Sequence, residues 1–369
     1  MNLFKNIALW AGLLCLLSPT LTLATDKKEF VRLVKKEFLG MSARTTMQLY
    51  NQYGKINIRP AGDLNANVSV RIAVFATDEA AAEKVFKRIK INFDNTGTWA
   101  KAETIIENDN SWGWDNGGSS YSIDYDVSLP TVANLDLRNQ YGHSTIPDMS
   151  SSVKASAEYG NLTFGNMTGP LNVRVQYGKV NIAGSRDATF ATEYTDITYS
   201  GEAGNININA QYGDVAIADA ADLLLEAEYV NFNIGHVKNI KASLQYGDVR
   251  IASTKTLTVK SEYTNFRIAS LTNKLDCNSI YGDVAIDRLD KAFGSINFVG
   301  EYTGLQITVP EGTSFAYDLK GEYARFSLPA GAKPTNSNKT DYENHWWGNI
   351  GTGAAKITAR STYGNISIR

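Results

Sequence analysis

Apolar and polar residues alternate along most of the chain, and the alternation restarts at regular intervals. In residues 257–263 every second position is apolar or small, which is typical of a strand with one buried face. After Tyr263 the apolar positions move to Phe266 and Ile268, so the pattern predicts a corner or bulge just after the tyrosine. The same skeleton recurs in two other segments: Ile206, Ile208, Ala210, Tyr212, Val215, Ile217 and Ile240, Ala242, Leu244, Tyr246, Val249, Ile251. Each repeat is therefore predicted to contain two short strands.

Tyrosines mark the repeat. Tyr141 and Tyr159 begin a series with intervals of 17 or 18 residues, Tyr53 is an outlying copy upstream, and Tyr363 closes the chain. The series continues at these intervals with Tyr177, Tyr194, Tyr212, Tyr229, Tyr246, Tyr263 and Tyr281, and Tyr302 and Tyr323 follow at steps of 21 residues. A constant period indicates one supersecondary unit that stacks on copies of itself.

The repeat predicts an all-β fold, namely a β-solenoid (a single-stranded β-helix) with coils of about 17–18 residues. The residue before the tyrosine alternates between Gln and Glu through most of the series. A coil of twice the length would stack each Glu on another Glu, whereas the shorter coil stacks Glu on Gln, which is the more stable arrangement. The alternation also places the tyrosines on the side of Leu, Val and Ile. They are therefore expected to form a core ladder, and the alternative is an exposed platform for sugars.

The N-terminal region differs in composition from the repeats. Residues 1–24 resemble a signal peptide, with Lys5, an apolar run over 7–17 and a cleavage site after Ala24. The alternative is a lipoprotein anchored at Cys15, although Leu14 stands where a small residue is expected.

Residues 25–140 are expected to form an N-terminal strand segment and a small α+β subdomain that caps the first coil. Asp78 is a candidate N-cap for its one helix, whose apolar face carries Ala82, Val85, Phe86 and Ile89. Residues 141–369 are assigned to the solenoid repeats, with a polar loop inserted at about 331–353. That loop is a candidate cover for the other end of the solenoid, because open solenoid ends expose unpaired strand edges.

Composition excludes several function classes. A net charge of -2 and a pI of about 6.0 give no electrostatic footprint for nucleic acid. The mature chain has no apolar run long enough to span a bilayer. Cys277 is its only cysteine, so no internal disulfide is expected.

Chemistry-bearing residues do not cluster in a catalytic or metal-binding pattern. The three histidines, at 143, 236 and 345, are scattered and have no metal-ligand spacing. Asp214, Asp248 and Asp283 recur at one position of the repeat, which favours outward or turn residues, since an active site occurs only once. The sequence therefore predicts a protein that is not an enzyme and needs no metal or cofactor.

Two tryptophan pairs depart from the repeat. Trp112 and Trp114, and likewise Trp346 and Trp347, lie among Asn, Asp and Gly residues. Loop tryptophans beside polar donors are typical of a contact with a glycan or a protein, so these four are the predicted ligand-binding residues. The alternative is that each pair folds back over one end of the rod.

The segments KKEF (35–38), LYNQYGKINI (49–58), IDYDVSLP (123–130) and the repeated QYGDVxI together resemble the DUF4097 family of adhesin-like β-solenoid proteins from Bacteroidetes envelopes. The resemblance implies an exported, non-enzymatic binding or structural protein of the periplasm, outer membrane surface or extracellular space. Its expected partner is a polysaccharide or an envelope protein. Two alternatives remain open: a polysaccharide lyase or hydrolase built on a β-helix, and a periplasmic accessory protein of an envelope-stress system.

Overall fold

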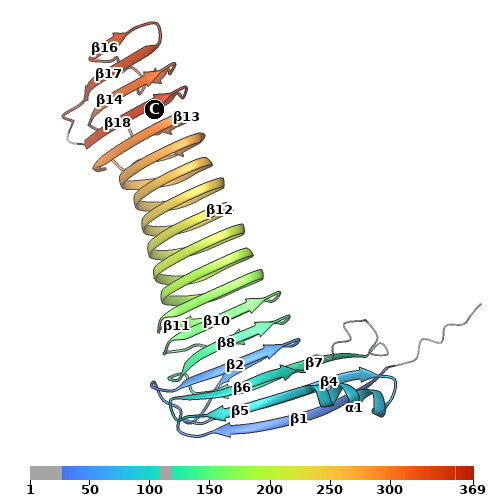
Figure 1. The fold of residues 1–369 in the computed structure, drawn as a ribbon. Coiled ribbons are helices and arrows are strands. Elements are labelled where there is room, and N and C mark those ends of the chain that lie inside the picture. The colour runs from blue at the N-terminus through green and yellow to red at the C-terminus, as the bar shows by residue number, and fades with distance from the viewer. Residues whose placement is uncertain (1–26, 108–118, 354) are drawn as a thin grey trace, which may run out of the picture.

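The computed structural model describes residues 27–107, 119–353 and 355–369. The predicted signal peptide and the Trp112 and Trp114 pair lie outside these ranges. The described chain forms an elongated rod that is almost entirely β-structure (Figure 1). This confirms the predicted nearly all-β, solenoid-like fold with one helix. Over the same residues, no helix has the length and apolar character that crossing a membrane requires.

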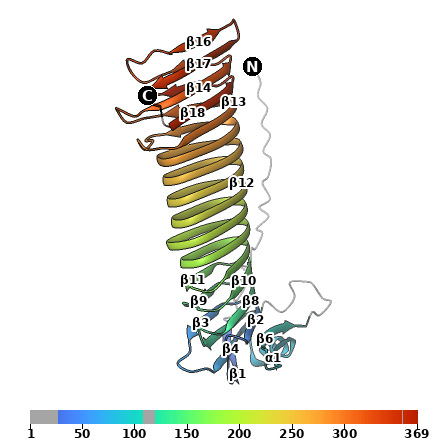
Figure 2. The ribbon, with the colours of Figure 1, turned by 90° about the vertical axis from the view of Figure 1, so that its left-hand side faces the viewer.

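The rod is a stack of rungs, and each rung has one strand before a tyrosine and one after it. The separate strands of the first rungs are β2 (Thr46–Gln52), β3 (Ile56–Pro60), β8 (Asn134–Gln140), β9 (Ser144–Ile146), β10 (Val153–Glu158) and β11 (Leu162–Met167). Val153 of β10 pairs in parallel with Leu135 of β8 and with Leu171 at the start of β12 (Leu171–Ile286). Through β12 the extended chain continues without a break and winds around the rod axis (Figures 1 and 2).

The core is a column of inward-facing side chains. The alternation predicted from the sequence is confirmed in β12, where the apolar residues on both sides of Tyr212 and Tyr246 are buried. One rung contributes Val173 and Val175 before its tyrosine, and Val180 and Ile182 after it, each at most 3% exposed. Successive rungs therefore merge into one continuous core, as a solenoid requires.

The N-terminal end carries strands that leave the winding pattern. The strands are β1 (Lys28–Phe38), β4 (Ala66–Ala76), β5 (Ile89–Asn95), β6 (Trp99–Ile106) and β7 (Ser120–Leu129). β6 and β7 pair in parallel with β2 and β3, and then β5 and β4 add antiparallel, with β1 outermost on β4.

Helix α1 (Glu79–Arg88) lies at this N-terminal end. Its N-cap is Asp78, whose side chain accepts a hydrogen bond from the Ala81 N–H, and its buried residues are Ala82, Val85 and Phe86. The predicted helix, its N-cap and three residues of its apolar face are confirmed, whereas Ile89 is buried but begins β5.

At the C-terminal end, chain order and spatial order diverge. The elements are β13 (Ser295–Ile307), β14 (Phe315–Glu322), β15 (Phe326–Ser327), β16 (Asn336–Lys339), β17 (Glu343–Ile350), β18 (Ala355–Thr362) and β19 (Ile366–Ile368). β18 lies between β13 and β14, so the last rung in sequence is the penultimate rung in space.

The polar loop predicted at about 331–353 contains two strands and so departs from the prediction. β17 pairs antiparallel with β14, and β16 pairs with β17 as the outermost strand (Figure 1). All four residues of β16 are exposed, so the hairpin lacks the apolar alternation by which a strand is recognised in sequence.

Candidate functional site

The repeated tyrosines form one stacked ladder along the rod. Neighbouring rings lie 4.6–5.2 Å apart between centroids, with interplanar angles of 2–8°. Tyr363 stacks between Tyr302 and Tyr323, which follows from the position of β18. We call this series, together with Tyr53 stacked on Tyr141, the tyrosine ladder: Tyr53, Tyr141, Tyr159, Tyr177, Tyr194, Tyr212, Tyr229, Tyr246, Tyr263, Tyr281, Tyr302, Tyr363 and Tyr323.

The ladder lies outside the core, contrary to the prediction. Its rings are 37–54% exposed. All thirteen tyrosines have a positive φ of 48–60°, the left-handed region that residues other than glycine rarely adopt. This backbone conformation interrupts the alternation at the corner and turns the tyrosine side chain outward, although its sequence position matches the inward series.

The residue after the tyrosine is glycine in some rungs and a larger residue in others. A Cβ at Gly178 would lie 1.9 Å from the carbonyl oxygen of Gly160 in the neighbouring rung, so that corner requires glycine. In other rungs a threonine follows, and its buried hydroxyl donates to a backbone carbonyl two residues earlier. Examples are Thr195 to Glu193 at 2.8 Å and Thr264 to Glu262 at 2.9 Å. Glycine and threonine thus both occur directly after the tyrosine, each in its own set of rungs.

The residues just before the tyrosines form a second row beside the ladder. Gln140 donates to Glu158 at 2.9 Å, Gln176 to Glu193 at 2.7 Å, and Gln245 to Glu262 at 2.9 Å. Gln211 and Glu228 form the equivalent pair at 3.3 Å. The predicted stacking of Glu on Gln in neighbouring rungs is therefore confirmed for these pairs.

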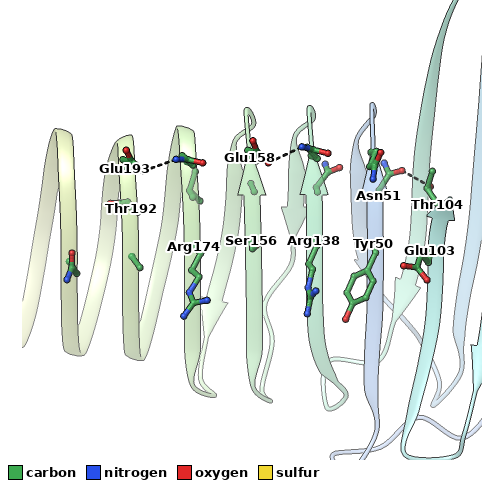
Figure 3. Close-up of a pocket in the computed structure, with 18 of the residues that line it drawn as sticks. Tyr50, Asn51, Glu103, Thr104, Arg138, Ser156, Glu158, Arg174, Thr192 and Glu193 are labelled. Atoms are coloured by element: carbon green, nitrogen blue, oxygen red, sulfur yellow. Dashed lines mark hydrogen bonds between the residues drawn. The ribbon is translucent and has the colours of Figure 1, made fainter. Parts of the chain in front are cut away.

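A groove runs along the rod between this Gln/Glu row and the third residue before each tyrosine. Its first part has a volume of about 720 Å³ and spans the rungs from Tyr50 to Gln211. Gln211 contacts Glu228, which lines the next hollow, of about 490 Å³, extending to Ile280. We call both parts together the axial groove (Figure 3 shows the first).

Two arginines from the strands before Tyr141 and Tyr177 line the first part of the axial groove. Arg138 lies with its guanidinium carbon 4.5 Å from the Tyr50 ring centroid, and its Nη2 is 3.4 Å from Asp136. The Tyr50 hydroxyl also donates to Asp136 at 3.1 Å, and burial together with the Asp136 charge raises the Tyr50 pKa. Arg174 has no hydrogen-bond or ion-pair partner among the residues that the structure describes.

Polar side chains also lie beneath the axial groove, among inward-facing positions. The Thr104 hydroxyl donates to Asn51 Oδ1 at 2.9 Å, and the Asn51 amide donates to the Ile123 carbonyl at 2.8 Å. By contrast, Asn139 Oδ1 and Thr192 Oγ1 are buried and have no hydrogen-bond partner among the described residues. An unpaired buried polar atom is costly to stability, and both atoms lie on the inward side of the strands that carry the groove.

Of the predicted tryptophan site, Trp346 and Trp347 lie within the described residues, and neither lines the axial groove. Trp346 and Trp347 lie on β17, in the hairpin at the C-terminal end. Trp346 packs edge-on against Phe326 with centroids 5.7 Å apart, while Trp347 is 37% exposed and lies 4.4 Å from the His345 ring. Trp346 thus packs against the protein, and Trp347 of the same pair is partly exposed to solvent.

The recurring acids form a hydrogen-bonded row after the tyrosines. Asp214 accepts from the Asn231 amide and Asp248 from the Asn265 amide, each at 3.0 Å, and the Asp283 N–H donates to Asn265 at 3.1 Å. These carboxylates face outward at the rung corners, as predicted. No group of three or more metal-ligating side chains occurs among residues 27–107, 119–353 and 355–369.

A family model described as Toastrack DUF4097 matches residues 127–369 of the chain. No curated protein matches the chain. Solved structures similar to the chain include a "putative cell adhesion protein" from Clostridium sporogenes, with 11% identity, a TM-score of 0.20, and coverage of 93% of this chain and 99% of that one. A "putative adhesin" from Bacteroides fragilis has 10% identity, a TM-score of 0.26, and coverage of 92% and 97%. A "putative lipid binding protein" from Parabacteroides distasonis has 9% identity, a TM-score of 0.25, and coverage of 92% and 97%.

Proposed function

The chain belongs to the Toastrack DUF4097 family, and from this premise we propose that it is an exported, non-enzymatic envelope protein that binds an extended polysaccharide along its axial groove. The proposal includes a coil of about 17–18 residues, supported by the pairing of Val153 with Leu171. It also assigns residues 25–140 to capping the first coil.

The observation that carries the proposal is the course of the axial groove along the rod, beside the tyrosine ladder. Its two hollows follow successive rungs from Tyr50 to Ile280, so a linear polymer lying parallel to the rod would meet similar polar groups at every rung. The ring faces are covered by neighbouring rings, so the ladder presents ring edges and hydroxyls. Many weak contacts of this kind add up when they are linked along one ligand.

The amide and carboxylate groups of the groove wall suit a polyhydroxylated ligand. Each Gln and Glu offers hydrogen-bond acceptors, and each Gln retains amide donors, which together match the donor and acceptor capacity of sugar hydroxyls. The exposed Trp347 at the C-terminal end, and Trp112 and Trp114 outside the described ranges, are proposed as additional glycan contacts.

The test is binding of the purified mature chain to a glycan array, followed by titration calorimetry with the polysaccharides that bind. A Ser156→Trp variant fills the groove at the third position before Tyr159. Its matched control is Asn233→Trp, which places the same side chain at an exposed position on the strand after Tyr229. We expect Ser156→Trp to abolish binding and Asn233→Trp to leave it unchanged. Absence of binding to every glycan and envelope fraction would refute the proposal.

A second arm of the test concerns the tryptophans. Replacing Trp112, Trp114, Trp346 and Trp347 with Ala should weaken glycan binding if they contribute contacts. If this variant binds like the unmodified chain while Ser156→Trp does not, the tryptophan part of the proposal is wrong and the groove part stands.

A further inference from the structure

Arginines and glutamates alternate over four successive rungs in the first part of the axial groove. The rungs of Arg138 and Arg174 carry Gln140 and Gln176, respectively, next to their tyrosines. The rungs between and above them carry small residues at the arginine position, and a glutamate beside the tyrosine. These two rungs hold Ser156 with Glu158 and Ala191 with Glu193. In these four rungs of the first part, arginine and glutamate thus occupy different rungs with a two-rung period. The second part differs, because Lys260 and Glu262 line it from one rung.

The two arginines are available to a ligand in different degrees. Arg138 is oriented by the Tyr50 ring and Asp136, at the distances given above, so its guanidinium is held in place at the groove's edge. Arg174 has no partner within the described ranges and leaves its five N–H donors to solvent. Figure 3 shows the two side chains projecting in the same direction on either side of Ser156.

The distance between the two arginines sets the spacing that acidic groups on a ligand would need. Arg138 and Arg174 are two rungs apart, which is about 10 Å for parallel strands. A single carboxylate cannot form direct hydrogen bonds with both guanidinium groups at that separation, so each arginine requires its own acidic group. The rung between them carries Glu158, which would repel a carboxylate and would instead accept from hydroxyl or amine donors.

We infer that the first part of the axial groove recognises a linear acidic polysaccharide with a carboxylate on every second sugar. Alternate carboxylates pair with Arg138 and Arg174, and the sugar between them lies over Ser156 with its donors directed to Glu158. Arginine suits this role because its planar guanidinium binds a carboxylate through two parallel hydrogen bonds. The inference rests on the proposed polysaccharide function and specifies the ligand class of the same groove.

The experiment compares three oligosaccharide series by titration calorimetry on the full mature chain. Hyaluronan oligosaccharides carry a carboxylate on alternate sugars, oligogalacturonates carry one on every sugar, and cello-oligosaccharides carry none. We expect hyaluronan oligosaccharides to bind most tightly, and their binding to weaken as salt concentration rises. Arg138→Gln and Arg174→Gln should each weaken that binding about tenfold or more, the usual loss for a charge-assisted hydrogen bond.

Arg250→Gln is the matched control, because Arg250 is an exposed arginine on the strand after Tyr246 and does not line the axial groove. It should change the affinity less than twofold. If cello-oligosaccharides bind as tightly as the acidic series and Arg174→Gln has no effect, the acidic-ligand inference is overturned, while loss of binding in Ser156→Trp would still support the proposed function. If oligogalacturonates bind at least as tightly as hyaluronan oligosaccharides, the alternate spacing is wrong. If no polysaccharide binds, both proposals fail.

Discussion

Replacing a tyrosine in the middle of the ladder tests whether ring stacking stabilises the rod. Tyr229 stacks on Tyr212 at 5.0 Å and on Tyr246 at 4.6 Å, and it holds a φ of 57°. Three substitutions separate these features. Tyr229→Phe keeps the ring, Tyr229→Ala removes the ring but keeps the left-handed strain, and Tyr229→Gly removes both.

The expected magnitudes follow from the two contacts and the backbone. A stacked aromatic pair contributes about 0.5–1.5 kcal/mol, so loss of two pairs should lower the free energy of unfolding by about 1–3 kcal/mol in Tyr229→Ala. A residue other than glycine in the left-handed conformation costs about 1–2 kcal/mol of backbone strain. Glycine removes this strain, but it also raises the entropy of the unfolded chain, which offsets part of the gain in stability. Tyr229→Gly should therefore be more stable than Tyr229→Ala by about 1 kcal/mol. Tyr229→Phe should lie within about 0.5 kcal/mol of the unmodified chain.

The assay is urea denaturation followed by far-UV circular dichroism, with amide hydrogen exchange at the neighbouring rungs as a local measure. The local measure is needed because a repeat protein can open in parts, and then a single transition underestimates the change. If Tyr229→Ala is no less stable than Tyr229→Phe, ring stacking does not stabilise the rod. If Tyr229→Gly is less stable than Tyr229→Ala, the left-handed conformation is not a source of strain.

Two further predictions concern the corners and the pH range. Gly178→Ala should destabilise the rod by about 3 kcal/mol in the same urea assay, because the new Cβ would meet the Gly160 carbonyl oxygen. The control Gly62→Ala should change stability little, because no atom lies within 4 Å of its new Cβ. Equal effects of the two substitutions would contradict the close approach of neighbouring rungs at Gly178. Burial raises the pKa of Tyr199 to about 12, and of Tyr125 further, so the unfolded chain ionises first as pH rises above 10. Burial likewise raises the pKa of the Cys277 thiol from 9.0 to about 12. Stability should therefore be constant up to about pH 9 and fall between pH 9 and 12. Thermal denaturation at fixed ionic strength that shows no fall would refute this assignment.

Local patterns in the sequence were sufficient to predict the core. The alternation around Tyr212 and Tyr246 identifies buried residues correctly because a strand has a period of two and its neighbours in the stack repeat it. The Glu-on-Gln pairs were predictable for the same reason, since registry follows once the period is known. The N-cap at Asp78 is also a local signal, and the structure places it as predicted.

Other features depend on conformation or on distant contacts. The outward turn of the tyrosines follows from a positive φ, and a bulky aromatic residue is among the least expected in that region, so the sequence pattern pointed to the core instead. The position of β18 between β13 and β14 is set by pairing between segments far apart in the chain. The groove residues Arg138, Ser156 and Arg174 form a pattern only after the rungs are aligned on the tyrosines, because each by itself is an ordinary strand residue outside the core.

The choice of tyrosine at a left-handed corner is explained by the ladder as a whole. Glycine or asparagine would adopt the left-handed conformation at any one corner with a lower free-energy cost, so a single tyrosine there is unfavourable. A tyrosine gains two stacking contacts only when both neighbouring rungs also carry one, and the end rings would each lose a partner. At both ends a tyrosine from outside the repeat supplies the missing contact. Tyr121 of β7 meets Tyr53 edge-on at 5.6 Å, and Tyr342, next to β17, lies 5.2 Å from Tyr323. The end segments therefore give each terminal ring of the ladder a second aromatic contact, in place of the stacking partner that it lacks.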